Sequence, residues 1–247
     1  MPLALLAVLA ALVLSACRVT SEVAVQVEPD GSGVVQVTVR LDEEATRRLG
    51  DPATALRVED LTAAGWVVRD PEAADGGVVL RAERPFASPE DLPAVLEEVG
   101  GRDGVFRDVS LAVSDGFART DYDFSSQVEL TGNPEQFGDD ALTAVLGGLA
   151  LARTPEELAL EGAADPEAIT LDVVVDLPGG EVTTNGEVRD GRAVWSFPVS
   201  GGEPTSARLT ATSTVGSGST SLLVVVGVVL VLLAAVLAVV GLVRRRG

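Results

Sequence analysis

The stretch VAVQVEPDGSGVVQVTVRL, residues 23–41, decides the fold of this 247-residue chain. Val23, Val25 and Val27 alternate with other side chains, and the alternation resumes after EPDGSG with Val35, Val37, Val39 and Leu41. Because successive side chains of a strand point to opposite faces, each half presents one apolar face. The Pro, Asp and Gly residues between the halves are typical of a turn. The stretch therefore predicts a β-hairpin.

Similar strand patterns recur along the chain, and short turns separate them. Residues 65–86 predict two strands joined by a glycine-containing loop, residues 178–200 predict two short strands, and residues 206–214 predict a last one. Three further strands have these apolar faces: Val109, Leu111 and Val113; Tyr122, Phe124, Ser126, Val128 and Leu130; Ile169, Leu171, Val173, Val175 and Leu177. Strands with one polar face, joined by short turns, indicate an antiparallel sheet.

Short helical patterns lie between the strands. Two are centred on DEEATRRL, residues 42–49, and DPATALRVEDLTAAG, residues 51–65. Three more begin with a capping residue (Ser88, Asn133 or Thr154), then proline, then an acid or amide three residues after the cap. In the first of these three, one face is predicted to be apolar, with Leu92, Val95, Leu96 and Val99 at i, i+3, i+4 and i+7. The predicted class is α+β: mainly antiparallel sheet with several short helices packed on it, plus a C-terminal transmembrane helix.

The N-terminal sequence predicts a signal peptide over 1–16, with a lipobox at 14–17. Its apolar run from Leu3 to Ala16 is too short for an ordinary membrane span but suits a signal-peptide core. Leu-Ser-Ala-Cys then places a cysteine where a bacterial lipoprotein is diacylated, and a lone cysteine has no disulfide partner. We therefore expect Cys17 to be lipidated. The alternative is an ordinary signal peptide, or an uncleaved anchor, in which Cys17 is incidental. The lack of Lys or Arg before the run counts against the lipobox: either the positive n-region is missing or the start codon is misassigned.

The C-terminal sequence predicts a membrane helix over 222–243, since 22 uncharged residues would form a helix of ~33 Å. The arginines that follow predict a cytoplasmic tail over 244–247. These features predict an extracytoplasmic domain over 18–212, a Gly/Ser/Thr linker over 213–221, and a single-pass protein of the cell membrane with its C-terminus in the cytoplasm.

Composition excludes several classes of chemistry. The net charge is −19, so the surface repels nucleic acid and no nucleic-acid partner is expected. Histidine is absent and cysteine occurs once, which removes Cys/His zinc sites and imidazole catalysis. We expect no enzyme activity, no catalytic residues, no cofactor and no metal site. The close acid pairs Asp121/Asp123 and Asp139/Asp140 lack the ligand spacing of a calcium loop.

The chain resembles the LppM family of actinobacterial envelope lipoproteins. The resemblance is carried by the lipobox, the opening strand pair, the GWVV strand at 65–68, and LPGGEVTTNGEVRDGRAVWSFP at 177–198. The Gly/Ser linker, the predicted membrane helix and the terminal arginines complete it. From the residues alone, Asn185-Gly186 is turn chemistry and Trp195 is a strand residue that faces the core. The resemblance implies an envelope-surface α+β domain that binds lipids or glycolipids without catalysis, and it transfers no ligand residues.

Three functions remain open: a lipid- or glycolipid-binding module at the membrane, a protein-interaction or scaffold domain without a small ligand, and a carboxylate enzyme such as a glycoside hydrolase. An apolar cavity would favour the first, and an exposed apolar patch without a cavity the second. The expected partners are the membrane and an envelope lipid or glycolipid; protein partners are not identified. We place the ligand at the apolar, glycine-interrupted helix DDALTAVLGGLALA, with these residues: Phe137, Leu142, Val145, Leu146 and Leu149.

Overall fold

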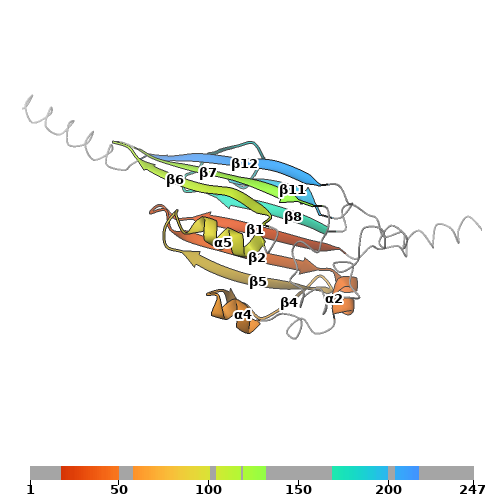
Figure 1. Ribbon diagram of the computed structural model, residues 1–247. Coiled ribbons are helices and arrows are strands. Elements are labelled where there is room, and N and C mark those ends of the chain that lie inside the picture. The colour runs from red at the N-terminus through yellow and green to blue at the C-terminus, as the bar shows by residue number, and fades with distance from the viewer. Residues whose placement is uncertain are drawn as a thin grey trace, which may run out of the picture.

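Two β-sheets make up most of the fold (Figure 1). The computed structural model describes residues 18–49, 58–100, 104–117, 119–131, 169–199 and 204–216. The larger sheet, sheet A, has the strand order β10-β11-β8-β1-β2-β5-β3, with β4 also paired to β5. Its strands are β1 (Val19–Val27), β2 (Gly33–Leu41), β3 (Val67–Val68), β4 (Glu72–Ala74), β5 (Gly77–Phe86), β8 (Ile169–Asp176), β10 (Glu187–Arg189) and β11 (Arg192–Pro198).

The smaller sheet, sheet B, has the strand order β6-β7-β12-β9. Its strands are β6 (Phe106–Asp115), β7 (Arg119–Leu130), β9 (Val182–Thr184) and β12 (Thr205–Gly216). Strand β12 extends four residues into the range 213–221 that was predicted to be a linker. The described helices are α2 (Glu43–Leu49), α4 (Val58–Ala63) and α5 (Leu92–Gly100).

The predicted opening hairpin is confirmed by the β1–β2 pair, in which Val27 lies opposite Gly33. The turn between them is closed by two backbone hydrogen bonds, from Glu28 N–H to the Ser32 carbonyl (2.8 Å) and from Gly31 N–H to the Glu28 carbonyl (2.9 Å). Gly31 has φ +84°, a conformation that glycine adopts without strain. The Ser32 hydroxyl and N–H both donate to Asp30, and these bonds lower the pKa of the Asp30 carboxyl.

One pair of strands departs from the predicted antiparallel arrangement. Strand β8 runs parallel to β1, with Val23 beside Val173 and Val25 beside Val175. Strand β8 lies between β1 and β11, and its inner face is buried. On its outer face Val174 is buried in a small cluster with Ala24 and Val194, whereas Thr170, Asp172 and Asp176 are half-buried. Burial of Val174 on the outer face, together with Val173 and Val175 on the inner face, accounts for the run of three valines in this strand.

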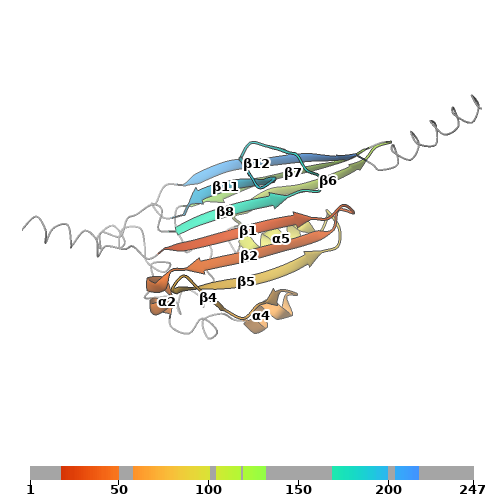
Figure 2. The same cartoon turned by 180° about the vertical axis from the view of Figure 1, so that it is seen from behind.

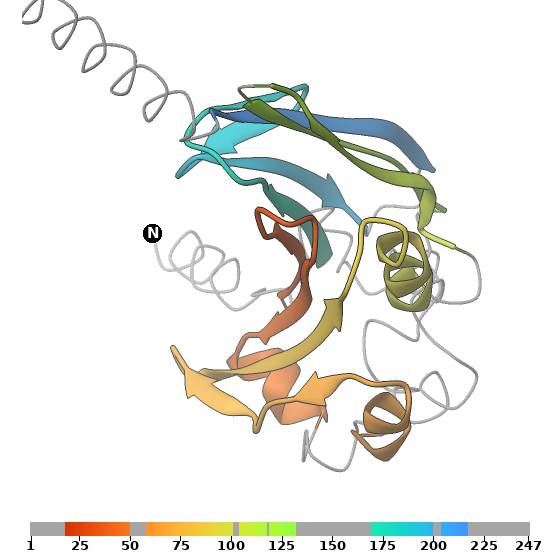
Figure 3. The ribbon, with the colours of Figure 1, turned by 90° about the vertical axis from the view of Figure 1, so that its left-hand side faces the viewer.

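The core lies between the sheets. Figure 3 shows that sheet A is curved and that α5 lies on the inner side of the curve. Sheet B lies on the same side of sheet A, at the other end of the curve. Buried side chains from both sheets form one cluster, and its largest fully buried members from sheet B are Tyr122, Phe124 and Leu209. The predicted apolar face of β7 is confirmed, since Tyr122, Phe124, Ser126, Val128 and Leu130 are all buried.

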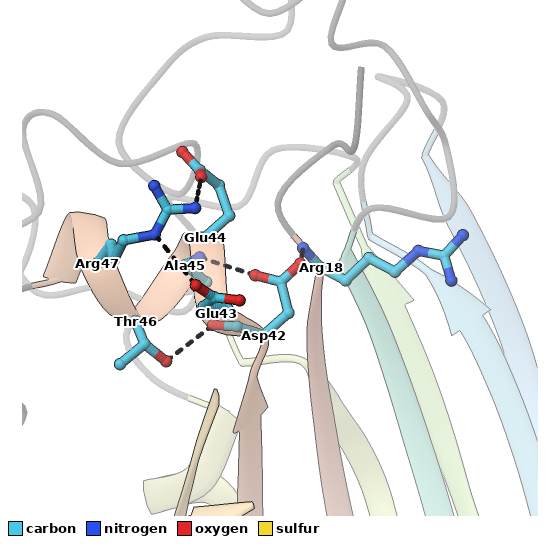
Figure 4. A network of polar contacts seen from close by, with 7 residues as sticks. All are labelled: Arg18, Asp42, Glu43, Glu44, Ala45, Thr46 and Arg47. Carbon is cyan, nitrogen blue, oxygen red and sulfur yellow. Dashed lines mark hydrogen bonds and ion pairs between the residues drawn. The ribbon is translucent and has the colours of Figure 1, made fainter. Parts of the chain in front are cut away.

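Helix α2 begins at a cap supplied by Asp42 (Figure 4). One carboxylate oxygen of Asp42 accepts a hydrogen bond from Ala45 N–H (2.7 Å), and the other accepts one from Arg18 N–H (2.8 Å). Asp42 N–H in turn donates to the Arg18 carbonyl (3.1 Å). Asp42 therefore caps the helix and also fixes the first described residue against sheet A.

The predicted α+β class is wrong, because the described fold is mostly β-sheet with three short helices. The sheets cover one another, so the helices occupy only the part of sheet A that sheet B leaves open. The helices predicted from Asn133 and Thr154 lie outside the described residues.

The predicted C-terminal transmembrane helix is not supported. Among the described residues, none of the helices has the length and apolarity to cross a membrane. The longest, α5, has nine residues and is ~14 Å long, about half of a bilayer core. The single-pass topology with a cytoplasmic C-terminus depended on that helix and is corrected with it; residues 217–247 lie outside the described part.

Candidate functional site

An apolar cavity of about 230 Å³ lies on the part of sheet A that sheet B leaves open. Its floor is built by facing residues of neighbouring strands: Val39 lies opposite Leu80, and Ala82 lies opposite both Val37 and Val68. Helices α4 and α5 supply the walls, so we call it the α4–α5 cavity. The lining residues are Val37, Val39, Leu61, Trp66, Val68, Leu80, Arg81, Ala82, Glu98 and Val99.

The first wall is fixed by the way α4 ends. Gly65 has φ +91°, and its N–H donates to the Thr62 carbonyl (3.0 Å), while Trp66 N–H donates to the Leu61 carbonyl (2.9 Å). This is a Schellman motif, in which a left-handed glycine satisfies the last carbonyls of the helix. The motif brings the residue after the glycine back towards the helix. Trp66 and Leu61 therefore stand together in the wall of the cavity.

The second wall is helix α5. Its start is fixed by a reciprocal pair: Ser88 N–H donates to the Asp91 carboxylate (3.0 Å), and Asp91 N–H donates to the Ser88 carbonyl (3.1 Å). The Ser88–Asp91 contacts form a turn, but regular helix begins at Leu92, so the predicted helix start at Pro89 is three residues too early. Leu92, Val95 and Leu96 are buried as predicted. Val99, the fourth residue of that face, is only half-buried because it lines the cavity.

A carboxylate joins the two walls at the rim. The Trp66 indole N–H donates to Glu98 Oε2 (3.1 Å), and the Arg84 guanidinium donates to the same oxygen. Arg81, also at the rim, is paired with Glu72 (2.5 Å). Both arginines are thus neutralised by acids, and the rim offers polar groups around an apolar interior. Such a site can hold an apolar chain with its polar end at the rim.

The NG pair at 185–186 has a different role from the one predicted. Neither residue has a positive φ, and the chain does not form a hairpin there: β9 belongs to sheet B and β10 to sheet A. The Asn185 side chain accepts hydrogen bonds from the Trp195 indole (3.0 Å) and from Thr210 N–H (3.0 Å). A Cβ on Gly186 would lie 2.5 Å from the Trp195 indole nitrogen. The pair therefore joins the two sheets, and Trp195 is buried as predicted.

The residues predicted as sites lie elsewhere in the chain. Cys17 and the predicted ligand residues Phe137, Leu142, Val145, Leu146 and Leu149 all lie outside the described residues. The residues of the α4–α5 cavity were missed because Val37, Val39, Leu80 and Ala82 have the alternation of ordinary core strands. The signal that was available is Gly65-Trp66 after a short helix, which places a large aromatic at a helix end.

Comparisons with known proteins give one structural match. No family model and no curated protein matches the chain. The NMR structure of the Mycobacterium tuberculosis LppM folded domain is similar to it at 14% identity, with a TM-score of 0.39, over 83% of this chain and 93% of that chain. At these values the match transfers neither residues nor function to this chain.

Proposed function

We propose that the protein is a non-catalytic envelope lipoprotein whose α4–α5 cavity binds the apolar chain of a lipid or glycolipid. The observation that carries the proposal is the cavity itself, which is lined almost entirely by aliphatic side chains and Trp66. Six of the lining residues are only partly buried: Val37, Val39, Leu61, Leu80, Ala82 and Val99. A bound alkyl chain would remove their remaining surface from water, at ~0.8 kcal/mol per buried methylene of the chain.

The size of the cavity favours one chain. Pockets for drug-sized ligands span roughly 300–1,000 Å³, so about 230 Å³ holds part of a larger amphiphile. The polar part would then lie at the rim, beside Arg81 and the Glu98–Arg84 pair. We propose a single-chain amphiphile, or one chain of a lipid whose second chain stays outside.

The second candidate function is a protein-interaction domain without a small ligand. Large exposed apolar side chains in the described part of the chain are Val67 on β3, Phe117 between β6 and β7, and Val188 on β10. They form no patch of the kind that marks a protein interface. Carboxylate catalysis has less support still, since Glu98 in the cavity is held by Trp66 and Arg84.

A substitution that fills the cavity tests the proposal. Ala82→Phe in the full-length chain places a ring on the floor, and Val188→Phe is the matched control because Val188 is 56% exposed on β10. We expect a fluorescent single-chain fatty acid to bind the unmodified chain and Val188→Phe saturably, and to lose at least about tenfold in affinity on Ala82→Phe, ~1.4 kcal/mol.

Two outcomes would contradict the proposal. The fatty acid could fail to saturate the unmodified chain, which would favour the protein-interaction function. It could also bind Ala82→Phe as tightly as Val188→Phe, which would put the ligand outside the cavity. Thermal unfolding of both variants shows whether either substitution has disturbed the fold.

A further inference from the structure

Two of the described residues that line the α4–α5 cavity are charged, and each is paired with a residue of opposite charge. The Arg81 guanidinium lies 2.5 Å from the Glu72 carboxylate, and the Glu98 carboxylate is bonded to the Arg84 guanidinium. Arg84 stands on the same face of β5 as Ala82 of the cavity floor, because alternate residues of a strand share a face. The two pairs together carry no net charge, although the chain as a whole carries −19.

Glu98 is held by two donors that come from different parts of the chain. Its Oε2 accepts hydrogen bonds from the Trp66 indole (3.1 Å) and from Arg84. Among the described residues, none donates a hydrogen bond to the other oxygen, Oε1. A carboxylate oxygen can accept further hydrogen bonds. Glu98 therefore keeps an acceptor for a ligand, while its charge is already matched.

A charged headgroup would disturb this arrangement. An anion beside Glu98 is repelled by the carboxylate, and to reach Arg84 it must displace Glu98 from the Trp66 indole as well. A cation beside Glu98 is repelled by the guanidinium that is bonded to the same carboxylate. Like charges placed side by side are a strong source of discrimination between ligands. A hydroxyl group is uncharged and can donate to Glu98 without separating the ion pair.

We propose that Glu98 makes the α4–α5 cavity selective for an amphiphile with an uncharged, hydroxyl-bearing headgroup, such as a monoacylglycerol. The inference rests on the proposed function of the cavity and adds the class of headgroup. In this role Glu98 does two things. Its Oε1 accepts a hydrogen bond from the headgroup, and its charge keeps Arg84 from attracting anions.

Competition against the fluorescent fatty acid tests the headgroup in the full-length chain. The competitors are monolauroylglycerol, laurate and dodecylamine, which have alkyl chains of the same length. At neutral pH they carry no charge, a negative charge and a positive charge. We expect monolauroylglycerol to displace the probe at a concentration about tenfold lower than either charged competitor.

Two substitutions separate the role of Glu98 from a change in net charge. Glu98→Gln keeps an oxygen for the Trp66 indole but removes the charge that matches Arg84. Laurate should then displace the probe at a severalfold lower concentration than from the unmodified chain, and salt should reduce this gain because it screens the guanidinium. Glu187→Gln is the matched control, since it removes the acid that is paired with Arg189 at 2.6 Å on β10. Figure 2 shows β11, the neighbour of β10, far across sheet A from β5, so this control should leave the order of competitors unchanged.

The outcomes separate this inference from the proposed function. Saturable binding of the probe with equal displacement by laurate and monolauroylglycerol would overturn the selectivity and leave the lipid-binding function standing. An unchanged preference in Glu98→Gln would overturn the role of Glu98, and thermal unfolding shows whether that variant is folded. The competitor series on the unmodified chain needs no substitution and decides the selectivity in either case. A probe that does not saturate the unmodified chain would overturn both proposals.

Discussion

The two halves of the inner face of sheet A differ in how completely they are covered. Under sheet B, the side chains of β8 and β11 are buried: Val173 is 1% exposed and Trp195 8%. Under α4 and α5, the equivalent residues of β2 and β5 remain half-buried, including Val37, Val39, Leu80 and Ala82. All these strands have the same alternation of apolar side chains. One half is nevertheless fully buried core, and the other half contains the cavity.

The covering layer accounts for the difference. Sheet B brings long strands across β8 and β11, and these strands bury large side chains such as Phe124 and Leu209. Helix α4 has six residues and is ~9 Å long, so it covers only a small part of a strand face. A strand pattern therefore predicts which face is apolar but does not predict how well that face is filled.

The largest expected effect is the loss of unfolding free energy when one side chain in each half is truncated to alanine. Phe124→Ala, at 1% exposure under sheet B, should cost about 3–5 kcal/mol of unfolding free energy, because it leaves a void between the sheets. Leu80→Ala on the cavity floor should cost less than about 2 kcal/mol, since this side chain already contacts the cavity. Urea unfolding measures both. Equal losses would mean that the two halves are packed alike.

Enlarging a side chain, the opposite change, should give a smaller contrast in the same direction. Ala211 is fully buried beside Phe124, and Ala82 lies on the cavity floor. Ala211→Leu should destabilise the fold by about 1–3 kcal/mol through overpacking. Ala82→Leu should change the unfolding free energy by about 0.5 kcal/mol or less, because the cavity accepts the added carbons. A large loss for Ala82→Leu in the same urea assay would show that the floor is tightly packed.

The smallest effect concerns a polar contact of the covered half. The hydroxyl of Tyr122 donates to the Pro29 carbonyl (2.7 Å), joining sheet B to the β1–β2 turn. Burial raises the pKa of Tyr122 above its ordinary 10.0, and Asp115 and Asp30 add to this effect. Tyr122→Phe should cost about 1 kcal/mol at neutral pH.

The raised pKa also predicts the pH dependence of that contact. Because the folded pKa lies above the unfolded one, the stabilisation is complete below pH 10 and is lost as the pH rises through the folded pKa. Tyr122 is the only tyrosine, so ultraviolet titration reads this group alone. The stability of Tyr122→Phe should fall less above pH 10 than that of the unmodified chain. Parallel decline of both would show that Tyr122 titrates normally.

Much of the local structure was predictable because its causes are local. The β1–β2 hairpin, the inward face of β7, and the buried face of α5 follow from the spacing of apolar residues and from turn and cap chemistry. Asn185-Gly186 misled the prediction for a physical reason. The same dipeptide that closes hairpins is used here because glycine leaves room for the Trp195 indole, and the requirement is visible only once the two sheets are packed.

The sequence by itself determined which side of each strand is apolar, where the turns fall, and that imidazole and disulfide chemistry are excluded. Tertiary structure alone decided that β8 pairs in parallel with β1, bringing together Thr20 and Thr170 across 150 residues of sequence. It also decided that sheet B covers one half of sheet A while short helices leave a cavity over the other. The physical reason is that side-chain alternation is set residue by residue, whereas pairing and covering depend on contacts between distant segments, which local spacing does not encode.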